Sequence, residues 1–466
     1  MPSTKGVIIV GAGPAGLFAA LALARAGEKN ILLLEKGKDI HERRCLLKGN
    51  RPTCFHCQPC SVVCGVGGAG AFSDGKLTLT ADFGGFLHEI LGRRALEELI
   101  DYVDHIYQEF GATSEFFGGE QQAVHDLQRQ AATADLTLLP ARIRHLGTEK
   151  CLEIVARLRN YLQDKVEIRT NTPVERLLCH EGGVLGVRTC AGEEILADYV
   201  ICGPGREGSE WFAGEAERLG LSAADNPVDI GVRVEVPAVV LEHITQKIYE
   251  SKLIYYSRSF DDRVRTFCMN PYGEVVMENN GGLITVNGHS YAEKKTGNTN
   301  FALLVSKSFT EPFKEPIRYG RNVAQLANML GGGALVQRLG DLLAGRRSTR
   351  ERIDRGLVRP TLEEATPGDL SLVLPYRHLL SILEMLEALD KVAPGVNSRH
   401  TLLYGVEVKF YSSRLAVNHS LETKVQNLFA VGDGAGVTRG LAQASAAGIV
   451  AAREILRRQA EQKNKG

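Results

Sequence analysis

The chain has 466 residues, and its 55 lysines and arginines balance its 55 aspartates and glutamates. With 44% hydrophobic and 24% charged residues, its composition excludes a disordered, collagen-like or disulfide-dense scaffold. The charge balance argues against nucleic acid or an anionic membrane as the main partner, because both need positive charge to bind phosphates. Two features stand out, the 50 glycines and the 10 cysteines, and both are clustered.

The first apolar segment covers residues 7–24 and contains no charge, so it has the hydropathy of a membrane span or a signal sequence. Three glycines and a proline interrupt its middle, and Lys5 alone forms a thin basic flank. We therefore expect no membrane span and no export signal, and a cytoplasmic protein whose thiols are reduced. On this expectation the cysteines are free, metal-bound or redox-active.

The N-terminus has the pattern of a dinucleotide-binding unit. A β-branched run at 5–10 precedes the glycine turn G-A-G-P-A-G at 11–16, a helix follows to about Ala26, and a strand at 31–34 ends in Glu35. The glycines permit a tight turn, close approach to a pyrophosphate and close packing of helix on strand. The helix N-terminus attracts phosphates, and the acid can bind ribose hydroxyls. The alternative is a glycine turn in an unrelated α/β sheet. The expected cofactor contacts are Gly11, Gly13, Pro14, Ala15, Gly16, Glu35, Lys36 and Arg44.

The C-terminal region decides between FAD and NAD. A strand at 427–431 is followed by G-D-G-A-G at 432–436 and by a helix of small residues from Leu441 to about Arg458. This order resembles the second FAD-binding motif of glutathione-reductase-like flavoproteins. The resemblance implies that Gly432 and Asp433 lie at the cofactor, with Asp433 on the ribityl chain. It also implies that the helix starting at Gly440 and Leu441 points its positive end at the flavin pyrimidine ring.

A third segment lies between these two. Strand 166–174 leads into a meander through 184–188 and 194–201, which ends at the turn C-G-P-G at 202–205. The order resembles the adenine-side part of the same superfamily, and this implies cofactor contacts at Val174 and Gly203. G-P-G-R-E-G at 203–208 also fits an NAD(P)-type glycine motif. No second strand with a terminal acid follows at the right distance, so we expect no dedicated NAD(P) domain.

Four cysteines, Cys54, Cys57, Cys60 and Cys64, form a C-x2-C-x2-C-x3-C run. The spacing copies the iron–sulfur run of bacterial ferredoxins without its terminal proline, and so predicts a [4Fe–4S] cluster or another metal as one interpretation. Redox thiols facing the flavin are a second interpretation, and inert thiols in a loop are a third. The compact run lacks the two separated knuckles of a structural zinc site.

A glycine-rich loop follows directly at 65–76. Glycines allow a backbone to approach a flat ring, and successive N–H groups can cradle a pyrophosphate or flavin N5. A surface Ω-loop is the alternative. The cofactor contacts expected from this loop are Gly68, Ala69, Gly70, Ser73 and Lys76.

The fold class that follows is α/β. Residues 1–225 and 402–466 are expected to form a Rossmann-like FAD-binding domain of the glutathione-reductase-like type, with a helical insertion at about 86–165. Residues 226–401 are expected to form an inserted α+β substrate domain. Such a domain needs a group that moves a proton opposite flavin N5. The candidates are Arg265 and Tyr272, flanked by strands and a turn, and Glu407 and Lys409, which alternate along a strand and share one face.

Three segments, at 67–77, 405–415 and 431–449, together resemble a family of bacterial and archaeal FAD-dependent dehydrogenases within the glutathione-reductase-like superfamily. The resemblance runs through nearly the whole chain. It implies FAD, a two-domain fold and redox chemistry.

We therefore expect an oxidoreductase that moves a hydride or two electrons between a small organic substrate and FAD. The candidate electron carriers are NAD(P)H visiting the flavin face, a ferredoxin-like protein, a quinone and oxygen. The alternative is an electron-transfer or redox-sensing flavoprotein without a small-molecule substrate of its own.

Overall fold

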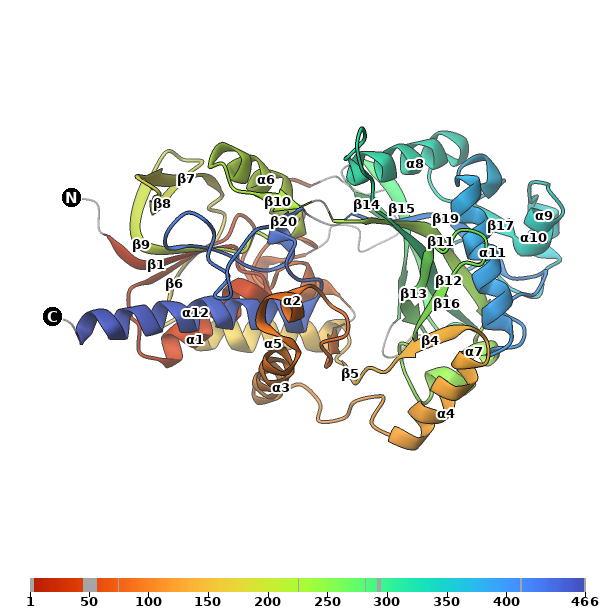
Figure 1. Cartoon of the computed structure of the whole chain (residues 1–466), viewed down its shortest axis with the longest axis horizontal. Coiled ribbons are helices and arrows are strands. Elements are labelled where there is room, and N and C mark those ends of the chain that lie inside the picture. The colour runs from red at the N-terminus through yellow and green to blue at the C-terminus, as the bar shows by residue number, and fades with distance from the viewer. Residues whose placement is uncertain are drawn as a thin grey trace. The chain divides into compact units, whose positions relative to one another are not determined.

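The structure is a computed structural model that describes residues 4–44, 57–73, 75–224, 226–280, 282–290, 295–410 and 413–464. The chain forms two compact units (Figure 1). Unit 1 comprises Met1–Glu115, Arg144–Asp225 and Ser412–Gly466, and unit 2 comprises Phe116–Ile143 and Asn226–Tyr411.

These units differ in two places from the boundaries that the sequence suggests. The expected return to the FAD domain at residue 402 lies inside unit 2, because β19 (Leu402–Lys409) is hydrogen-bonded between two strands of that unit. The expected insertion at 86–165 is divided, and its middle part belongs to unit 2. There β4 (Leu136–Leu139) pairs with β12 (Lys252–Tyr256).

A seven-stranded sheet organises unit 1. Its parallel part has the order β6 (Glu167–Arg169), β2 (Ile31–Leu34), β1 (Lys5–Val10), β9 (Glu194–Cys202) and β21 (Leu428–Ala430). The first half of β9 pairs antiparallel with β8 (Gly183–Thr189), and β8 pairs with β7 (Val174–His180). Strands β1, β2 and β21 are apolar and almost wholly buried, as expected for strands covered on both faces.

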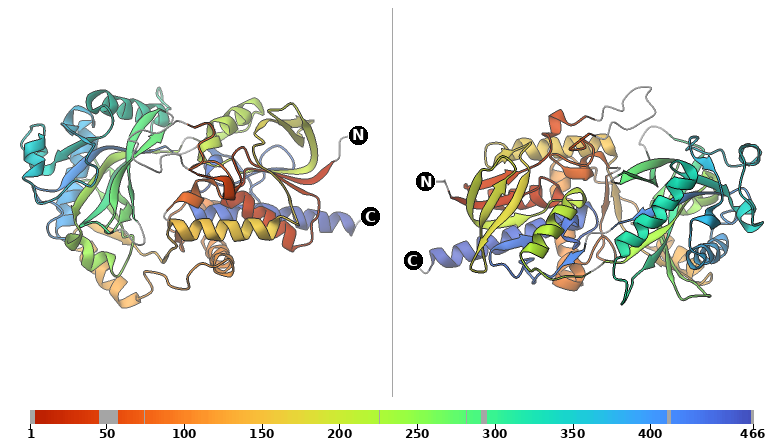
Figure 2. Two further views of the ribbon diagram at one scale, coloured as in Figure 1. Left: turned by 180° about the vertical axis from the view of Figure 1, so that it is seen from behind. Right: turned by 90° about the horizontal axis from the view of Figure 1, so that it is seen from above.

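The helices of unit 1 are α1 (Pro14–Arg25), α2 (Leu87–Leu91), α3 (Arg93–Glu109), α5 (Thr148–Leu162), α6 (Ser209–Arg218) and α12 (Leu441–Lys463). The rear view in Figure 2 shows α5, α1 and α12 running alongside one another. Helix α12 approaches α1 closely, since a Cβ atom at Gly448 would lie 2.0 Å from the carbonyl oxygen of Ala15. Two short pairs, β3 (Lys76–Thr78) with β5 (Ile143–His145) and β10 (Ala223–Ala224) with β20 (Arg414–Leu415), complete the unit.

Unit 2 is built on an eight-stranded sheet. The strand order is β18 (Thr366–Pro367), β17 (Leu335–Arg338), β19, β11 (Val228–Pro237), β16 (Asn298–Lys307), β13 (Arg263–Asn270), β12 and β4. All neighbours are antiparallel except β17 and β18. A separate hairpin is formed by β14 (Glu274–Asn280) and β15 (Leu283–His289). The helices are α4 (Gln121–Ala132), α7 (Ala238–Thr245), α8 (Pro316–Gly331), α9 (Leu339–Leu343), α10 (Arg350–Asp354) and α11 (Tyr376–Asp390).

The predicted fold class is therefore confirmed: a Rossmann-like α/β unit is combined with a second, mixed unit. Among the described residues, no helix has both the length and the apolar character needed to cross a bilayer.

Candidate functional site

The glycine turn at residues 11–16, between β1 and α1, leaves open space beside Gly13, and we call this turn and space the cradle. A Cβ atom at Gly11 would lie 2.3 Å from the carbonyl oxygen of Gly203, and one at Gly16 would lie 1.9 Å from that of Gly11. These two glycines are required for packing. At Gly13 the nearest atom to such a Cβ is 4.0 Å away, the Cα of Gly68. The space beside Gly13, in front of the first turn of α1, therefore fits a pyrophosphate bound at a helix N-terminus.

Glu35 ties the cradle to the rest of unit 1. Its carboxylate accepts hydrogen bonds from the N–H groups of Ala12 (2.8 Å), Gly37 (2.8 Å) and Gly65 (3.0 Å), and the residue is only 6% exposed. Oε1 accepts two of these bonds and Oε2 accepts one. A carboxylate oxygen has two lone pairs, so Oε2 keeps one for a further donor such as a ribose hydroxyl. Glu35 therefore has a structural role that the sequence did not suggest, and its contact with the ribose stays a prediction.

The glycine-rich loop lies against this cradle. The N–H of Gly67 donates to the carbonyl of Ala12 at 2.8 Å, and a Cβ at Gly68 would lie 3.1 Å from the Cα of Gly13. A Cβ at Gly70 would lie 2.4 Å from Cδ2 of Leu441, the first residue of α12. The loop, the first glycine turn and the start of α12 therefore meet, as expected if one cofactor contacts all three.

The remaining contacts expected from this loop differ in exposure. Ser73 stabilises the loop, because its hydroxyl donates to the carbonyl of Gly70 at 2.8 Å. Ala69 is exposed, and Lys76 begins strand β3 half-buried. Their contacts with the cofactor stay predictions.

Arg43 was missed by the sequence argument, which selected Arg44. Arg43 is 5% exposed, and its guanidinium donates to the carbonyls of Ser61 (2.9 Å), Val62 (2.8 Å) and Val66 (2.7 Å). It therefore holds the segment that leads into the glycine-rich loop. Arg44 is exposed. The two arginines are adjacent in the chain, so only the path of the loop decides which side chain turns inward.

The structure describes the predicted metal-binding cysteine run only in part. Cys54 lies outside the described residues, and Cys57 is exposed, Cys60 half-buried and Cys64 buried. Burial raises the pKa of the Cys64 thiol to about 11, so the thiol is protonated in the metal-free chain. Within the described ranges, no three His, Cys, Asp or Glu side chains form a group that could hold a metal ion.

The second motif begins at the end of β21. Asp433 follows Gly432, and its Oδ1 accepts from the Thr438 hydroxyl (2.7 Å) and from the N–H of Gly440 (3.3 Å). Arg206 Nε lies 3.8 Å from the other carboxylate oxygen. Burial raises the pKa of the Asp433 carboxyl, and Arg206 opposes that effect. Asp433 thus holds the turn that starts α12, at the position where the resemblance implies the ribityl chain.

The other expected contacts lie around the edge of this site. Lys36 Nζ is 4.0 Å from Glu207 Oε1, Val174 begins β7, and Gly203 packs on Gly11. Their contacts with the cofactor stay predictions.

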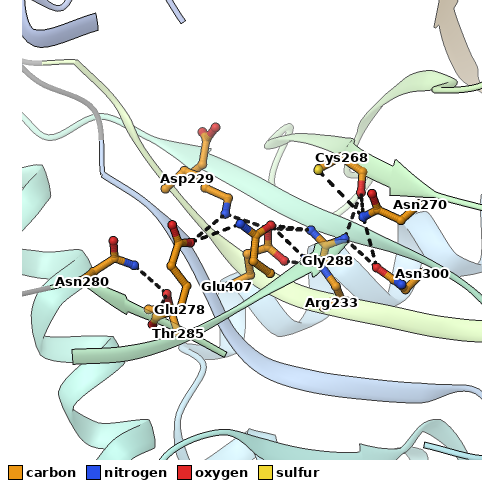
Figure 3. A network of polar contacts seen from close by, with 12 residues as sticks. Asp229, Arg233, Cys268, Asn270, Glu278, Asn280, Thr285, Gly288, Asn300 and Glu407 are labelled. Atoms are coloured by element: carbon orange, nitrogen blue, oxygen red, sulfur yellow. Dashed lines mark hydrogen bonds and ion pairs between the residues drawn. The ribbon is translucent and has the colours of Figure 1, made fainter. Parts of the chain in front are cut away.

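Unit 2 contains a buried network of charged and amide side chains (Figure 3). Arg233 of β11 and Glu407 of β19 are both 0% exposed and form a two-bond ion pair, with distances of 2.7 Å and 2.9 Å. Lys409 Nζ lies 3.1 Å from Glu407 Oε1 and 3.8 Å from Glu278 of β14. Burial by itself would raise the pKa of Glu407, but Arg233 and Lys409 outweigh it and lower the pKa. Glu407 is therefore held ionised.

Asn270 and Asn300 extend the network. Arg233 Nη1 donates to the carbonyl of Cys268 and to Oδ1 of Asn300, both at 2.9 Å. A Cβ at Gly288 would lie 2.4 Å from Arg233 Nη1, so the hairpin strand β15 needs glycine at this contact. The signal that could have found Arg233 is a charged residue at the centre of the β-branched strand V-R-V-E-V.

Three of the four predicted catalytic residues lie in one region of unit 2. Glu407 and Lys409 are paired, and Arg265 forms a buried ion pair with Asp229. Arg265 and Lys409 both flank the ring of Phe267, at 4.6 Å and 5.8 Å from its centroid. This part of unit 2 therefore combines buried ion pairs with a half-buried aromatic ring.

Tyr272 differs from the other three. Its hydroxyl donates to Glu242 Oε1 at 2.5 Å, and that bond raises its pKa, which keeps the hydroxyl protonated. The proton is therefore held more tightly than on an ordinary tyrosine, and Tyr272 is the weaker acid for it.

Comparisons with known proteins agree with this geometry. Residues 6–42 match the family described as FAD binding domain, residues 227–410 match "FAD-dependent protein, C-terminal domain-like", and residues 360–463 match "Glucose inhibited division protein A". The first match covers the glycine turn and Glu35, and the second covers almost the whole second part of unit 2.

A protein of Clostridium beijerinckii, described as uncharacterized, is 29% identical over 474 residues, which cover 96% of this chain and 80% of the relative. Solved structures with similar folds include E. coli quinol fumarate reductase (TM-score 0.42, 14% identity, 98% of this chain and 71% of that one). L-proline dehydrogenase from P. horikoshii has a TM-score of 0.40 and 12% identity, with 98% and 94% covered. Glycine oxidase from Geobacillus kaustophilus has a TM-score of 0.40 and 13% identity, with 97% and 95% covered.

The family matches and the cradle together define the class of protein. The chain is a flavoprotein, its cofactor is FAD, and its general class is that of FAD-dependent oxidoreductases.

Proposed function

We propose that the chain is a dehydrogenase or reductase that transfers a hydride or two electrons between a small organic substrate and FAD. FAD supplies the two-electron chemistry when it is bound. The observation that supports this most is the meeting of three distant segments. The loop lies against the first glycine turn at Gly13 and Pro14, and Gly70 of the loop lies against Leu441 at the start of α12.

Each segment would have a separate task in holding FAD. The N–H groups at the start of α1 would bind the pyrophosphate, because a helix N-terminus attracts anions. The remaining lone pair of Glu35 Oε2 would accept a ribose hydroxyl. Asp433 would meet the ribityl chain, and the N-terminus of α12 would stabilise negative charge on the pyrimidine ring.

Unit 2 would supply the substrate contacts. The region around Phe267 supports this, because Arg265 and Lys409 flank a half-buried ring and Lys409 is itself held by Glu407. Glu407 would then act as a positioning residue for Lys409. Tyr272 and Lys409 are the groups that would move a proton, Tyr272 through the hydroxyl that donates to Glu242.

The electron carrier would be NAD(P)H, a ferredoxin-like protein or a quinone. An electron-transfer or redox-sensing flavoprotein without its own substrate is the second candidate. A [4Fe–4S] centre at Cys54–Cys64 would favour the ferredoxin-like partner, and iron and sulfide analysis of anaerobically purified protein would decide on that centre.

The experiment that tests the proposal starts from the absorbance spectrum of the purified chain and the identity of its released flavin. The FAD-loaded protein is then mixed anaerobically with panels of amino acids, hydroxy acids and amines, and with NADH and NADPH. Bleaching of the flavin band by an organic compound supports a dehydrogenase. Bleaching by a nicotinamide or protein donor alone supports the electron-transfer candidate. A chain that takes up no FAD overturns both.

A further inference from the structure

Unit 2 contains three arginines that share one buried carboxylate. Asp341 of α9 is 1% exposed, and its Oδ1 lies 3.0 Å from Arg346 Nε and 3.8 Å from Arg352 Nη1. Its Oδ2 lies 3.9 Å from Arg338 Nη1 and accepts a hydrogen bond from the Ser348 hydroxyl at 2.8 Å. We call Arg338, Arg346 and Arg352 the arginine cluster.

The arginine cluster carries more positive charge than Asp341 can balance. Three guanidinium groups face one carboxylate, and among the described residues none of the three has a second carboxylate as a partner. Burial by itself would raise the pKa of Asp341, but its hydrogen bonds and the charges of the neighbouring arginines outweigh burial and lower the pKa. Asp341 is therefore ionised and contributes one negative charge, which leaves an excess of two positive charges in the cluster.

Arg338 is the member of the cluster that is most removed from water. It ends β17, and its side chain is only 8% exposed. Within the described part of the chain, its Nε is a buried donor without a hydrogen-bond partner. A buried charge needs a counter-charge, and a buried donor needs an acceptor. One kind of group meets both requirements, an anion that accepts hydrogen bonds.

The ring of His400 lies in the field of the same positive charges. Its Nδ1 is 3.4 Å from Arg338 Nη2. Burial lowers the pKa of His400, and the charges of Arg338 and Arg399 lower it further. Arg399 lies beside α9, because a Cβ atom at Gly340 would be 2.8 Å from its Cβ. An anion bound here would raise the pKa of His400, since a nearby negative charge favours the imidazolium.

The geometry also selects the chemical class of the anion. Guanidinium groups bind the oxygens of a phosphate group through parallel N–H bonds, and a phosphate dianion matches an excess of two positive charges. Solvent reaches the cluster at Arg346 and Arg352, whose side chains are 52% and 32% exposed. The burial of Arg338 favours one small anion over a nucleic acid, which binds along an exposed basic surface.

We propose that the arginine cluster and His400 form a binding site for one phosphate group, either free phosphate or the phosphate of a small ester. In the bound state Arg338 Nε and the guanidinium of Arg352 donate to the phosphate oxygens, and Asp341 keeps the cluster in place. The site goes beyond the proposed redox function, because its residues belong to unit 2 and the FAD cradle belongs to unit 1.

The test uses inorganic phosphate as the probe on the full chain with FAD, and chloride at equal ionic strength as the reference. The chain carries isotope-labelled histidine, and the NMR signal of His400 is identified by its loss in His400→Gln. We expect phosphate to shift this signal saturably, to raise the pKa of His400, and to raise the thermal unfolding midpoint, because a ligand that binds the folded chain stabilises it. A His400 signal that responds to phosphate and chloride alike, or to neither, overturns the proposal. A chain without FAD refutes the proposed function, and the same titration of the FAD-free chain still tests the phosphate site.

A matched pair of variants locates the phosphate. Arg352→Gln removes one guanidinium from the cluster, whereas Arg355→Gln removes an exposed arginine whose Nε donates to the carbonyl of Glu351 at 3.0 Å. We expect R352Q to bind phosphate about tenfold more weakly and R355Q to bind it like the unaltered chain. Equal weakening in both variants, or in neither, overturns the proposal.

The source of the phosphate group is decided by comparing phenyl phosphate with inorganic phosphate in the same titration. Tighter binding of phenyl phosphate supports a small phosphate ester as the ligand, and tighter binding of inorganic phosphate supports the free ion. Binding of neither overturns the proposal.

Discussion

The ion pair between Arg233 and Glu407 gives the sharpest prediction about unit 2. Glu407→Gln keeps the shape of the side chain but removes its charge, which leaves Arg233 buried at 0% exposure without its carboxylate. Removing one partner of a buried pair costs about 3–5 kcal/mol, because the other charge remains desolvated. Lys409 loses the same partner at 3.1 Å. We therefore expect the free energy of unfolding to fall by about that amount in urea titrations followed by far-UV circular dichroism.

The matched control is Glu387→Gln, which removes the same charge from an exposed pair. Arg258 Nη2 and Glu387 Oε2 are 2.9 Å apart, but the two side chains are 68% and 58% exposed. Such a pair contributes about 0–1 kcal/mol. If the free energies of unfolding of E407Q and E387Q differ by less than about 1 kcal/mol, the buried Arg233–Glu407 pair contributes no more to stability than an exposed pair, and the reasoning is refuted. Replacing both partners, as in Arg233→Met with Glu407→Leu, should cost less than E407Q, since neither member of the pair is left charged and unpaired.

Three further predictions concern the cradle, the loop and a buried histidine. Gly13→Ala should fold with near-normal stability, because Gly13 has φ −73° and its added Cβ would meet no close atom. That Cβ would occupy the space expected for the pyrophosphate, so the variant should lose FAD on gel filtration. An FAD content like that of the unaltered chain would contradict this placement of the pyrophosphate. Arg43→Gln removes the guanidinium that donates to the carbonyl of Val66, so it should weaken FAD retention and make the segment near Val66 sensitive to protease. Arg44→Gln should do neither. Equal FAD retention and equal protease sensitivity of the two variants would refute the role of Arg43. Burial lowers the pKa of His378 to about 4 from 6.5. Between these two pH values the imidazole is protonated in the unfolded chain but neutral in the folded protein. The free energy of unfolding should therefore fall by about 3 kcal/mol as the pH drops from about 6.5 to 4. His378→Phe should remove that part of the pH dependence of denaturation, and an unchanged slope would exclude His378 as its source.

The parts of the site that could be predicted from sequence depend on local geometry. Gly11, Gly13 and Gly16 follow a strand and open a helix, and Glu35 ends the next strand, so spacing alone brings them to one end of the sheet. Asp433 follows β21 in the same way. The order of strand, turn and helix is determined by residues that are close in sequence, because the steric and hydrogen-bonding constraints that form these elements are local.

Other features depend on contacts between residues far apart in the chain. Arg233 and Glu407 are separated by 174 positions. They become diagonal neighbours only because β11 pairs with β19, in a register that places Glu407 opposite Gly231 and Arg233 opposite Tyr404. The choice of Arg43 over Arg44 depends on the path of a loop that lies more than fifteen residues further along the chain. The apolar cavity lined by Leu17, Ile106 and Leu158 is formed by residues from four helices, α1, α3, α5 and α12, and from loops. The sequence by itself therefore determined an FAD-binding Rossmann unit, while the tertiary structure decided which charges are buried, which arginine turns inward and where an apolar space remains. The physical reason is that burial and ion pairing are set by which elements pack together, and no local pattern encodes that packing.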